Sequence, residues 1–468
     1  MNSSEIIDKI NHIKARIEKL IEGGHLDEAK AALSGIESFI PGDPDLFSMK
    51  AVIAIMEGDL PTAEKCLNEA LNDNGDNFDL LYNMAYICEQ MKDYQIAANF
   101  YSNARRVSNA AQRIITDEAI NHLRSSCGIE NFKCEKVLHG TMEIANQMYT
   151  LTRGLRRHGI MADTCNYYPT YLGYKSDYVY NISAYNDKQK LKQDQLKILQ
   201  NAINKYDLFH FHFGSSLTLD KSDLMVLADH SKKMFMHYWG SDVRLYSKAA
   251  KLSKFVAVKT IDEDAIKRNI ELCAKYIDHC IVGDYELYEY VKDYYNNVHV
   301  LPVAIDLEKF PVKEAQENER PVVVHAPTSQ AIKGTEHILK AVQELKQKYD
   351  FEFILVSNKS NECAKAIYRQ ADIIIDQLLI GCYGVFAVES MAMGKPVISW
   401  ISDFMKEKYP KDLPIFIANP ENICQQLESL LKDKQLRKDI GQKGRKYVEK
   451  YHDMNLVSRK LLDLYRNS

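Results

Sequence analysis

The 468-residue sequence lacks the features that mark several common classes of protein. Its ten cysteines show neither Cys-x-x-Cys pairs nor the Cys/His spacing of zinc sites, and no disulfide pairing can be read from them. The net charge is only −4, which gives no indication of general nucleic-acid binding. No apolar run is long enough to predict a membrane-spanning helix.

The composition is that of an ordinary globular protein. Of the residues 46% are hydrophobic and 26% are charged, and a length of 468 residues predicts two or three domains rather than a single core. The chain starts with the polar residues Met-Asn-Ser-Ser-Glu, which lead into a charged helix and not into an apolar signal segment. We therefore expect a protein of the reducing cytoplasm.

Acidic pairs and histidines are present, but none forms a convincing metal site. Asp43 and Asp45 belong to a helix turn, and the acids at 262–264 have the pattern of a solvated helix start. His210 and His212 alternate along a predicted strand and therefore share one face. Because no nearby acid or cysteine completes a ligand set, we interpret both histidines as structural or cleft-lining, and we expect no metal and no cofactor.

A period of 34 residues organises the N-terminal part of the chain. Four sets of positions share this interval: Ala29, Ala63 and Ala97; Leu33, Leu67 and Tyr101; Ile36, Ala70 and Ala104; and Gly24, Gly58 and Lys92. Small residues let paired helices approach closely, and larger ones fill the groove to the next pair. The pattern resembles the tetratricopeptide repeat and predicts a helical domain over residues 1–108. Such arrays bind proteins or peptides on a concave face; self-association and structural support are the alternatives.

One more helix is expected at residues 109–132, as a cap on the repeats or a link to the next domain. Ile114, Ile115, Ala119 and Leu123 are spaced as an apolar stripe on it.

From residue 136 onward, apolar strands alternate with helical segments, which predicts parallel sheets with right-handed crossovers. In the first half the expected strands are 137–141, 208–213, 234–236, 255–257, 280–282 and 298–303, with a helix at 143–158. In the second half the expected strands are 322–325, 352–356, 373–375 and 396–399, with helices at 336–349, 364–369 and 435–466, the last broken near residues 452–453.

The predicted fold class is therefore α/β, with two consecutive doubly wound, Rossmann-like domains preceded by an all-α repeat domain. We place these two domains at 133–312 and 313–468, because Pro302, Pro311 and the charged run 313–320 mark a connection. The final helix is expected to pack back toward the first of them. In such folds a ligand binds between the carboxyl ends of the strands.

Residues 381–396 (GCYGVFAVESMAMGKP) are the most informative segment. Glycines follow a β-rich run and open a loop whose backbone amides can approach a ligand. The next helix presents its positive N-terminus to the same place, and it contains an acid, Glu389, where a neutral residue is more ordinary. This layout predicts a site for a phosphate-bearing small molecule.

Five landmarks occur in a fixed order: the Gly140-Thr141 loop, residues 237–242 (HYWGSD), residues 301–306 (LPVAID), Lys333-Gly334, and the run from Tyr383-Gly384 to Pro396. Through them, residues 134–468 resemble a retaining glycosyltransferase of family 4 with the GT-B fold. The resemblance implies metal-independent transfer of a sugar from a nucleoside diphosphate sugar, with the departing phosphate helping to deprotonate the acceptor.

The resemblance also implies roles for single residues. Lys333 would place a cation against the donor diphosphate, and the backbone amides of Gly384 and Val385 would contact the same phosphates. Glu389 would bind the donor ribose; its alternative is an ion pair with a nearby lysine such as Lys395.

On the acceptor side the resemblance places His237 near the transferred sugar, with Asp242 close by, and these two are the expected catalytic residues. A histidine that satisfies a local backbone group is the alternative. Gly140 and Thr141 resemble an acceptor-side loop, although a plain strand–helix turn is possible. Asn146 and Gln147 fall on the first turns of the next helix, and we assign them no role.

The chain departs from the family pattern at two places. Gly381 stands where relatives carry the first of two glutamates, which contacts the transferred sugar, so that a backbone amide, Asp376 or a water would have to replace it. Residues 328–330 (TSQ) stand where an arginine usually precedes the donor lysine. These departures leave donor choice open.

The sequence therefore predicts a sugar transferase whose helical repeats recruit a protein acceptor, such as a bacterial flagellin, or an assembly partner. Polysaccharide or spore-coat synthesis is an alternative acceptor class. A non-catalytic scaffold that binds nucleotide sugars is the alternative outside enzymology, and an epimerase or phosphorylase on the same fold is a third.

Overall fold

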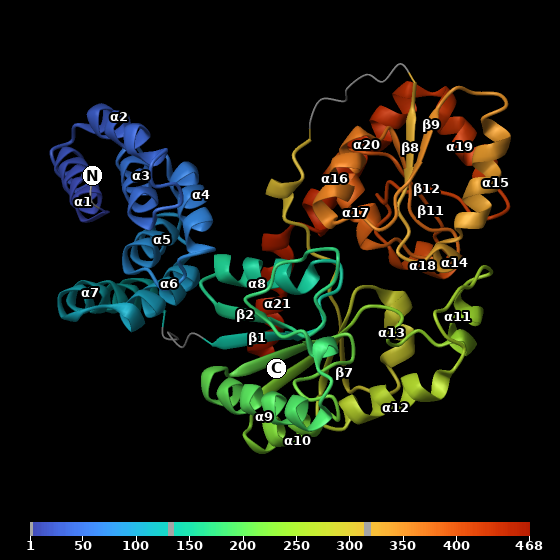
Figure 1. The fold of residues 1–468 in the computed structure, drawn as a ribbon, viewed down its shortest axis with the longest axis horizontal. Coiled ribbons are helices and arrows are strands. Elements are labelled where there is room, and N and C mark those ends of the chain that lie inside the picture. The colour runs from blue at the N-terminus through green and yellow to red at the C-terminus, as the bar shows by residue number, and fades with distance from the viewer. Residues whose placement is uncertain (1–2, 130–134, 313–319) are drawn as a thin grey trace. The chain divides into compact units, whose positions relative to one another are not determined.

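The computed structural model describes residues 3–129, 135–312 and 320–468 (Figure 1). The chain divides into two compact units. Unit 1 comprises Met1–Glu135 together with Leu155–Met161, and unit 2 comprises Lys136–Gly154 together with Ala162–Ser468. Most of the charged connection expected at 313–320 lies outside the described residues. No helix in the described parts is long and apolar enough to cross a membrane.

Unit 1 begins with antiparallel helix pairs. The pairs are α1 (Ser3–Glu22) with α2 (Leu26–Glu37), α3 (Pro44–Met56) with α4 (Leu60–Leu71), and α5 (Phe78–Gln90) with α6 (Tyr94–Val107). Each pair occupies one 34-residue period, and Ala29, Ala63 and Ala97 are fully buried where the helices approach. The expected array of helical repeats is confirmed.

The turn inside each pair is set by a left-handed residue. Gly24 and Gly58 have φ of 74° and 79°, and Lys92 takes the same place in the third pair with φ of 65°. A non-glycine residue rarely adopts this conformation, so the geometry of the repeat imposes a strained position on Lys92.

Helix α7 (Ala110–Cys127) follows, begun by a reciprocal cap between Asn109 and Gln112. The helix was expected, but its apolar stripe was placed wrongly. Ile114 and Ile115 are 63% and 43% exposed, whereas Ile120 and Leu123 are buried. The buried positions follow the helical period from Thr116, and the two isoleucines lie outside that face.

Unit 1 also holds the segment Leu155–Met161. The buried side-chain amides of Asn99 and Asn103 donate to the backbone carbonyls of His158 and Gly159, at 2.8 and 2.9 Å. Gly159 has φ of 70°, and a Cβ there would lie 2.8 Å from Cβ of Asn99, so this contact requires glycine.

In unit 2 the first sheet is parallel, with the order β3-β2-β1-β4-β5-β6-β7. Its strands are β1 (Lys136–Thr141), β2 (Met161–Asn166), β3 (Tyr178–Val179), β4 (Leu208–His212), β5 (Lys233–Tyr238), β6 (His279–Val282) and β7 (Asn297–Val300). Its helices are α8 (Gln147–Arg157), α9 (Lys188–Lys205), α10 (Ser222–Asp229), α11 (Tyr246–Leu252), α12 (Glu263–Ala274) and α13 (Tyr285–Val291).

Two expectations for this domain were wrong, and two strands were missed. Residues 255–257 form no strand, and β2 and β3 were not predicted. The helix expected at 143–158 begins only at Gln147. The buried Glu143 carboxylate accepts hydrogen bonds from the amides of Met148 and Tyr149, so it satisfies the first turn instead of belonging to it.

The second sheet is also parallel, with the order β12-β11-β10-β8-β9. Its strands are β8 (Val322–His325), β9 (Glu352–Leu355), β10 (Ile373–Ile375), β11 (Val397–Ser399) and β12 (Phe416–Ile417). Its helices are α14 (Gln330–Lys333), α15 (Thr335–Leu345), α16 (Asn361–Gln370), α17 (Val385–Ala392), α18 (Asp403–Lys408), α19 (Ile423–Lys432) and α20 (Lys434–Tyr451).

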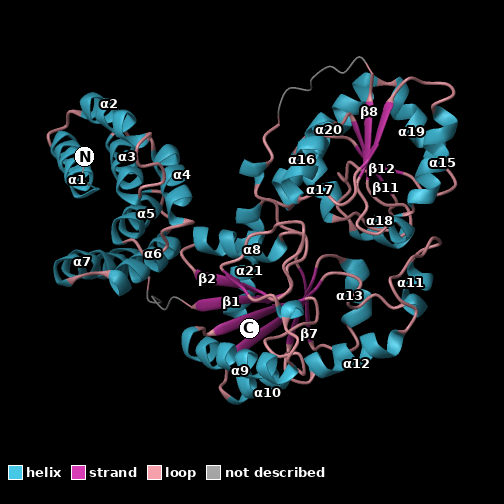
Figure 2. Cartoon of the chain, in the orientation of Figure 1, coloured by secondary structure: helices cyan, strands magenta, loops and turns pink. Residues whose placement is uncertain are grey.

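Both faces of this second sheet are buried. Ile374 points into one apolar cluster, and its neighbours Ile373 and Ile375 point into another on the opposite face. Helices flank the strands on both sides (Figure 2), which gives the doubly wound arrangement. The predicted fold class, two such α/β domains after an all-α domain, is confirmed.

The last helix, α21 (Met454–Asn467), returns to the first sheet. It is separated from α20 by His452 and Asp453, and the Asp453 carboxylate accepts from the amides that begin α21. Nζ of Lys233, on β5, donates to the carbonyl of Tyr465 at 2.8 Å. The break predicted at 452–453 is therefore present, and the end of the chain packs against β5.

Candidate functional site

Unit 2 gathers polar groups where the strands of its two sheets end. One group, joined by hydrogen bonds, surrounds Lys333, the last residue of α14. Its ammonium donates to Oδ1 of Asp376 at 2.9 Å, and Oδ2 of the same carboxylate accepts from the amide of Gly384 at 2.8 Å. Asp376 is buried and follows β10. One carboxylate thus fixes the lysine ammonium beside the N-terminus of α17.

The Gly384 amide, which we expected to contact the donor phosphates, has a partner within the chain. Because Gly384 N already donates to Asp376, it is not free to bind a phosphate. Gly384 caps α17, so the first amides inside the helix are those of Val385 and Phe386. Both oxygens of the Asp376 carboxylate likewise accept hydrogen bonds within the chain. In this structure they are therefore not available to contact a sugar in place of a glutamate at position 381.

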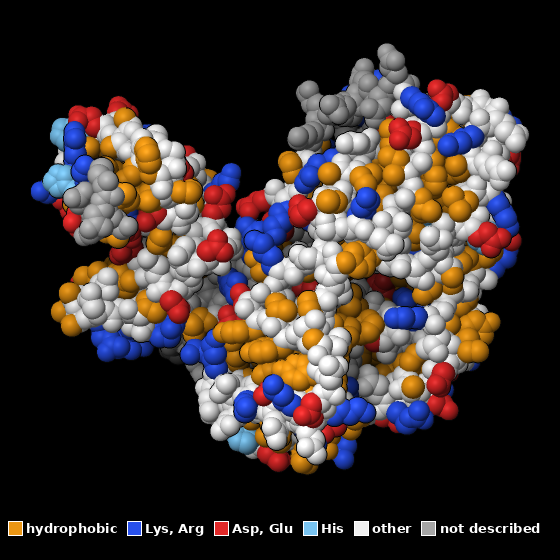
Figure 3. Space-filling model, viewed as in Figure 1, with side chains coloured by type: hydrophobic (Ala, Val, Ile, Leu, Met, Phe, Trp, Pro, Cys, Tyr) orange, Lys and Arg blue, Asp and Glu red, His pale blue; other side chains and the backbone are white. Residues whose placement is uncertain are grey.

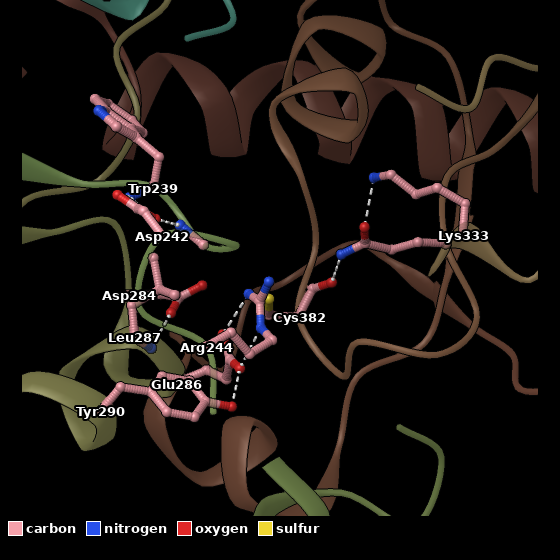
Figure 4. A network of polar contacts seen from close by, with 11 residues as sticks. Trp239, Asp242, Arg244, Asp284, Glu286, Leu287, Tyr290, Lys333 and Cys382 are labelled. Atoms are coloured by element: carbon pink, nitrogen blue, oxygen red, sulfur yellow. Dashed lines mark hydrogen bonds and ion pairs between the residues drawn. The ribbon is translucent and has the colours of Figure 1, made fainter. Parts of the chain in front are cut away.

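A second connection runs from Lys333 into the glycine loop. Lys333 also donates to the side-chain oxygen of Gln377, whose amide donates to the carbonyl of Cys382 (Figure 4). Gln377 is buried directly after Asp376. The lysine, the strand end and the loop are therefore one hydrogen-bonded unit.

Gly381 has a backbone that excludes the glutamate of the family pattern. Its φ is 89°, and a Cβ built there would lie 3.0 Å from Cβ of Ser402 and 3.2 Å from Oγ of Ser253. A larger residue would need both a left-handed backbone and a displaced neighbour. Glycine therefore suits the left-handed backbone and the close neighbours of this loop.

Glu389 lies half-buried on α17. Burial raises the pKa of its carboxyl to about 7, and the charge of Lys365 opposes that shift. Both residues line a small cavity with Gln147 and Asp306, which come from the first α/β domain. The cation that acts on Glu389 is thus Lys365, on α16, and not Lys395, whose ammonium is influenced by Asp372.

Across from the glycine loop, carboxylates gather at the end of β6. Asp284 and Glu286 each have an oxygen close to the Cys382 thiol, with all three atoms within 4.8 Å of one another (Figure 4). Glu286 forms a two-point ion pair with Arg244, at 2.8 and 2.7 Å, and also accepts from Tyr290 at 2.6 Å.

Asp284 differs from its neighbour Glu286. One of its oxygens caps α13 by accepting from Leu287 N at 3.0 Å, and the residue is partly exposed. Burial and the Glu286 charge raise the pKa of Asp284 to about 6. It is an acid with remaining accessible surface, close to the residue that follows Gly381.

His237 lies on β5 and Asp242 lies in the turn after it, and the two have different surroundings. The Asp242 carboxylate accepts from Trp239 N at 3.1 Å and from Gly240 N at 2.7 Å, so it holds the turn after the strand. Burial raises its pKa to about 6. His237 is buried, stacks on Trp239 with ring centroids 4.0 Å apart, and accepts or donates at Nδ1 with His210.

Gly140 and Thr141 do not form a loop. They are the last residues of β1 and are buried. The Thr141 hydroxyl donates to the carbonyl of Ser216 at 3.1 Å and also contacts Oγ of Ser215 at 3.0 Å. Gln147, to which we assigned no role, clamps the backbone of Ala304 through both of its side-chain atoms, at 3.0 and 2.8 Å.

Two groups of residues among those described have metal-ligand geometry. In the group of Asp284, Glu286 and Cys382, the Glu286 carboxylate is already committed to Arg244. The other group is His139, His210 and His212, all fully buried. We had placed His210 and His212 on one face, but not with His139, because the strands that bring them together are separated in sequence.

Several residues of the site were missed from the sequence. Gln377, Arg244, Glu286 and Lys365 are partners of predicted residues, but they lie in loops or helices without a distinctive motif. Asp284 was the one with a usable signal, since it lies two residues after the end of β6, much as Asp376 follows β10.

No protein-family model matches the chain, and no curated protein matches it. Among solved structures, sucrose-phosphate synthase from Thermosynechococcus elongatus aligns at 15% identity and a TM-score of 0.49, over 72% of this chain and 99% of that one. HepE from Anabaena, in complex with UDP and glucose, aligns at 12% identity and a TM-score of 0.48, over 71% and 100%. A mutant O-GlcNAc transferase of Thermobaculum terrenum aligns at 11% identity and a TM-score of 0.41, over 100% and 98%. At these identities and scores the matches assign neither family nor function.

Proposed function

We propose that this chain is a glycosyltransferase that moves a sugar from a nucleoside diphosphate sugar to an acceptor, with retention at the anomeric carbon. The observation that carries the proposal is the lysine site. Asp376 holds the Lys333 ammonium beside the N-terminus of α17, and both features favour a diphosphate. Glu389, on the same helix, is proposed to accept hydrogen bonds from the donor ribose.

The proposed reaction uses the diphosphate as both leaving group and base. The bond between C1 of the sugar and the phosphate oxygen breaks, and the acceptor oxygen bonds to C1 on the same face. The acceptor proton moves to the departing phosphate. Lys333 and the amides of Val385 and Phe386 stabilise the negative charge that develops on that phosphate.

Asp284 is the proposed carboxylate on the sugar side. Gly381 has no carboxylate that could contact the transferred sugar. The Asp376 carboxylate already accepts hydrogen bonds from the Lys333 ammonium and the Gly384 amide. Asp284 approaches from the end of β6 and lies close to Cys382. With a pKa of about 6 it is ionised at neutral pH, so it can stabilise positive charge on the sugar ring.

The acceptor is proposed to be a protein that the helical repeats recruit, for which a bacterial surface protein such as flagellin is one example. Polysaccharide or spore-coat synthesis is the alternative acceptor class. A non-catalytic scaffold is the second candidate function, and the replacement of a family glutamate by Gly381 is the observation that favours it.

A panel of UDP-, GDP-, ADP-, CDP- and dTDP-sugars tests the proposal by release of the nucleoside diphosphate. We expect turnover with at least one donor. Asp284→Asn keeps the cap on α13, because asparagine caps helices as well as aspartate does. It should nevertheless lower kcat by about 100-fold, the effect typical of a lost transition-state contact.

Asp293→Asn is the matched control, because Asp293 is exposed and pairs only on the surface with Lys248. We expect its kcat to equal that of the wild type. Binding of a nucleotide sugar without any release, across the whole panel, would instead establish the scaffold.

A further inference from the structure

Four buried histidines lie on one face of the first sheet, where apolar residues are more usual. His139 lies on β1, His210 and His212 lie on β4, and His237 lies on β5. The strands are neighbours, with His139 opposite His210 and His212 opposite His237. All four side chains are buried, so each ring nitrogen needs a hydrogen-bond partner inside the protein.

The direction of these hydrogen bonds is set at Trp239. Its indole Nε1 can only donate, and it lies 3.2 Å from Nδ1 of His212. That nitrogen must therefore accept. Because a neutral imidazole carries one proton, His212 holds it on Nε2 and donates to Nδ1 of His139 at 3.0 Å.

The same rule fixes which atom donates in the hydrogen bonds from His139 to Tyr465 on the final helix, and from there to His210 and His237. His139, which accepts at Nδ1, holds its proton on Nε2, 3.3 Å from the hydroxyl of Tyr465 on α21. The Tyr465 hydroxyl in turn donates to Nδ1 of His210. His210 then donates from Nε2 to Nδ1 of His237 at 3.2 Å.

His210, His212 and His237 are neutral, as this chain of donors requires. Burial lowers the pKa of His210, His212 and His237 well below the ordinary value, and neighbouring histidines lower it further for each. A second proton on any of the three would place two donors against each other in the chain.

We propose that Tyr465 and the other histidines fix the tautomer of His237, so that its buried Nε2–H is a hydrogen-bond donor for a ligand oxygen. Among the described residues, Nε2 of His237 has no hydrogen-bond partner. A buried donor without an acceptor is costly, so an acceptor is expected from outside the chain. His139, His210, His212 and Tyr465 are positioning residues in this account. That the ligand is a sugar rests on the proposed function.

The tautomers can be read directly by long-range ¹H–¹⁵N correlation spectra of the full chain labelled with ¹⁵N-histidine. We expect His139, His210, His212 and His237 all to be protonated on Nε2. Two buried histidines serve as internal controls with the opposite tautomer. Nδ1 of His325 and of His452 lies 2.8 and 2.9 Å from a backbone carbonyl, to which it must donate.

Removal of one hydroxyl tests the role of the final helix. In Tyr465→Phe, His210 loses its donor, and His237 should populate both tautomers. With a donor that wild-type protein turns over, kcat should fall by about tenfold, the loss expected for one hydrogen bond, while KM stays within about twofold. Tyr451→Phe is the matched control, because the Tyr451 hydroxyl donates to the exposed Asp412 and not to a histidine of the first sheet.

The proposal is overturned if wild-type His237 carries its proton on Nδ1, or if Tyr465→Phe leaves the His237 tautomer unchanged. A metal bound by His139, His210 and His212 would also overturn it, since ligation would use the lone pairs that these hydrogen bonds occupy; metal analysis of the purified protein detects that outcome. The tautomers of the wild type decide the inference even if Tyr465→Phe does not fold or no donor is turned over.

Discussion

Glu389 is the residue at which pH should control donor binding. Its pKa of about 7 means that the carboxyl gains a proton as the pH falls through neutrality. A protonated carboxyl accepts fewer hydrogen bonds from a ribose, so donor affinity should fall as the pH drops below about 7.

Glu389→Gln removes this titration. We expect weaker donor binding at high pH and an affinity that no longer depends on pH in this range, measured by calorimetry. The variant should also be more stable to heat at high pH. A folded-state pKa raised above the unfolded value gives stability that is lost as the pH rises through about 7. An affinity of the wild type that does not change between acid and alkaline pH would contradict this role.

At the residue scale, the sequence predicted the parts of the site that lie in one stretch of chain. Lys333, Gly384, Glu389 and His237 were identified by motif spacing, and the structure places the first two beside one buried carboxylate. Their roles in binding and catalysis stay predictions. The sequence did not predict that Asp376 would occupy the Gly384 amide, because that contact depends on how a strand end meets a loop.

The packing of α8 against α21 is the element-scale feature most open to test. At Gly154 on α8, a Cβ would lie 2.5 Å from Oγ of Ser458 and 3.0 Å from Cγ of Met454, both on α21. Gly154→Ala should therefore displace α21 and destabilise the protein by about 1–3 kcal/mol, the cost of overpacking. Urea unfolding measures the difference.

Gly35 is the matched control for this substitution. It lies in α2, has no heavy atom within 4 Å of a built Cβ, and is exposed. Gly35→Ala should stabilise the chain by up to about 1 kcal/mol through helix propensity. Equal stability of Gly154→Ala and the wild type would show that α21 does not pack against α8 as described.

Elements with a strong period were predictable, and short or polar ones were not. The repeat helices and the apolar strand β10 follow from spacing alone. The strand β2 has the sequence MADTCN, which has no apolar run, and it is supported by hydrogen bonds between Thr164 and Asp177. The apolar residues at 255–257 lie instead in a loop, where Val256 packs partly buried against the first domain's core.

Contacts between segments that are far apart in the chain could not be predicted from the sequence. Tyr465 and His210 are 255 residues apart, yet they share a hydrogen bond. A tyrosine in an amphipathic helix gives no sign of such a partner. His210 and His212, at alternate positions of one strand, did indicate a shared face, but not the residues of other strands that contact it.

At the scale of the whole molecule, acidic and basic side chains are interspersed over the face shown in Figure 3, in keeping with a net charge of −4. Charge therefore does not identify an acceptor surface.

The repeats of unit 1 are the proposed recruiting element. Deletion of residues 1–108 should abolish transfer to a protein acceptor while hydrolysis of the donor persists.

The deletion needs a control, because unit 1 also includes residues 155–161. The double variant Asn99→Ala, Asn103→Ala keeps the repeats but removes the hydrogen bonds to the carbonyls of His158 and Gly159. If it loses acceptor transfer as the deletion does, the defect lies in that segment. Acceptor transfer that survives the deletion would contradict recruitment by the repeats.

Binding of a diphosphate by Lys333 and the N-terminus of α17 can be measured by titration calorimetry with UDP, GDP, ADP and CDP. We expect at least one of the four to bind, and Lys333→Met to weaken its binding by about 10- to 100-fold, the value of a charged hydrogen bond. Lys340→Met, which removes an exposed lysine paired with Glu336, should leave the affinity unchanged. Equal affinity of the wild type and Lys333→Met, or no binding of any of the four, would show that Lys333 does not form a diphosphate site.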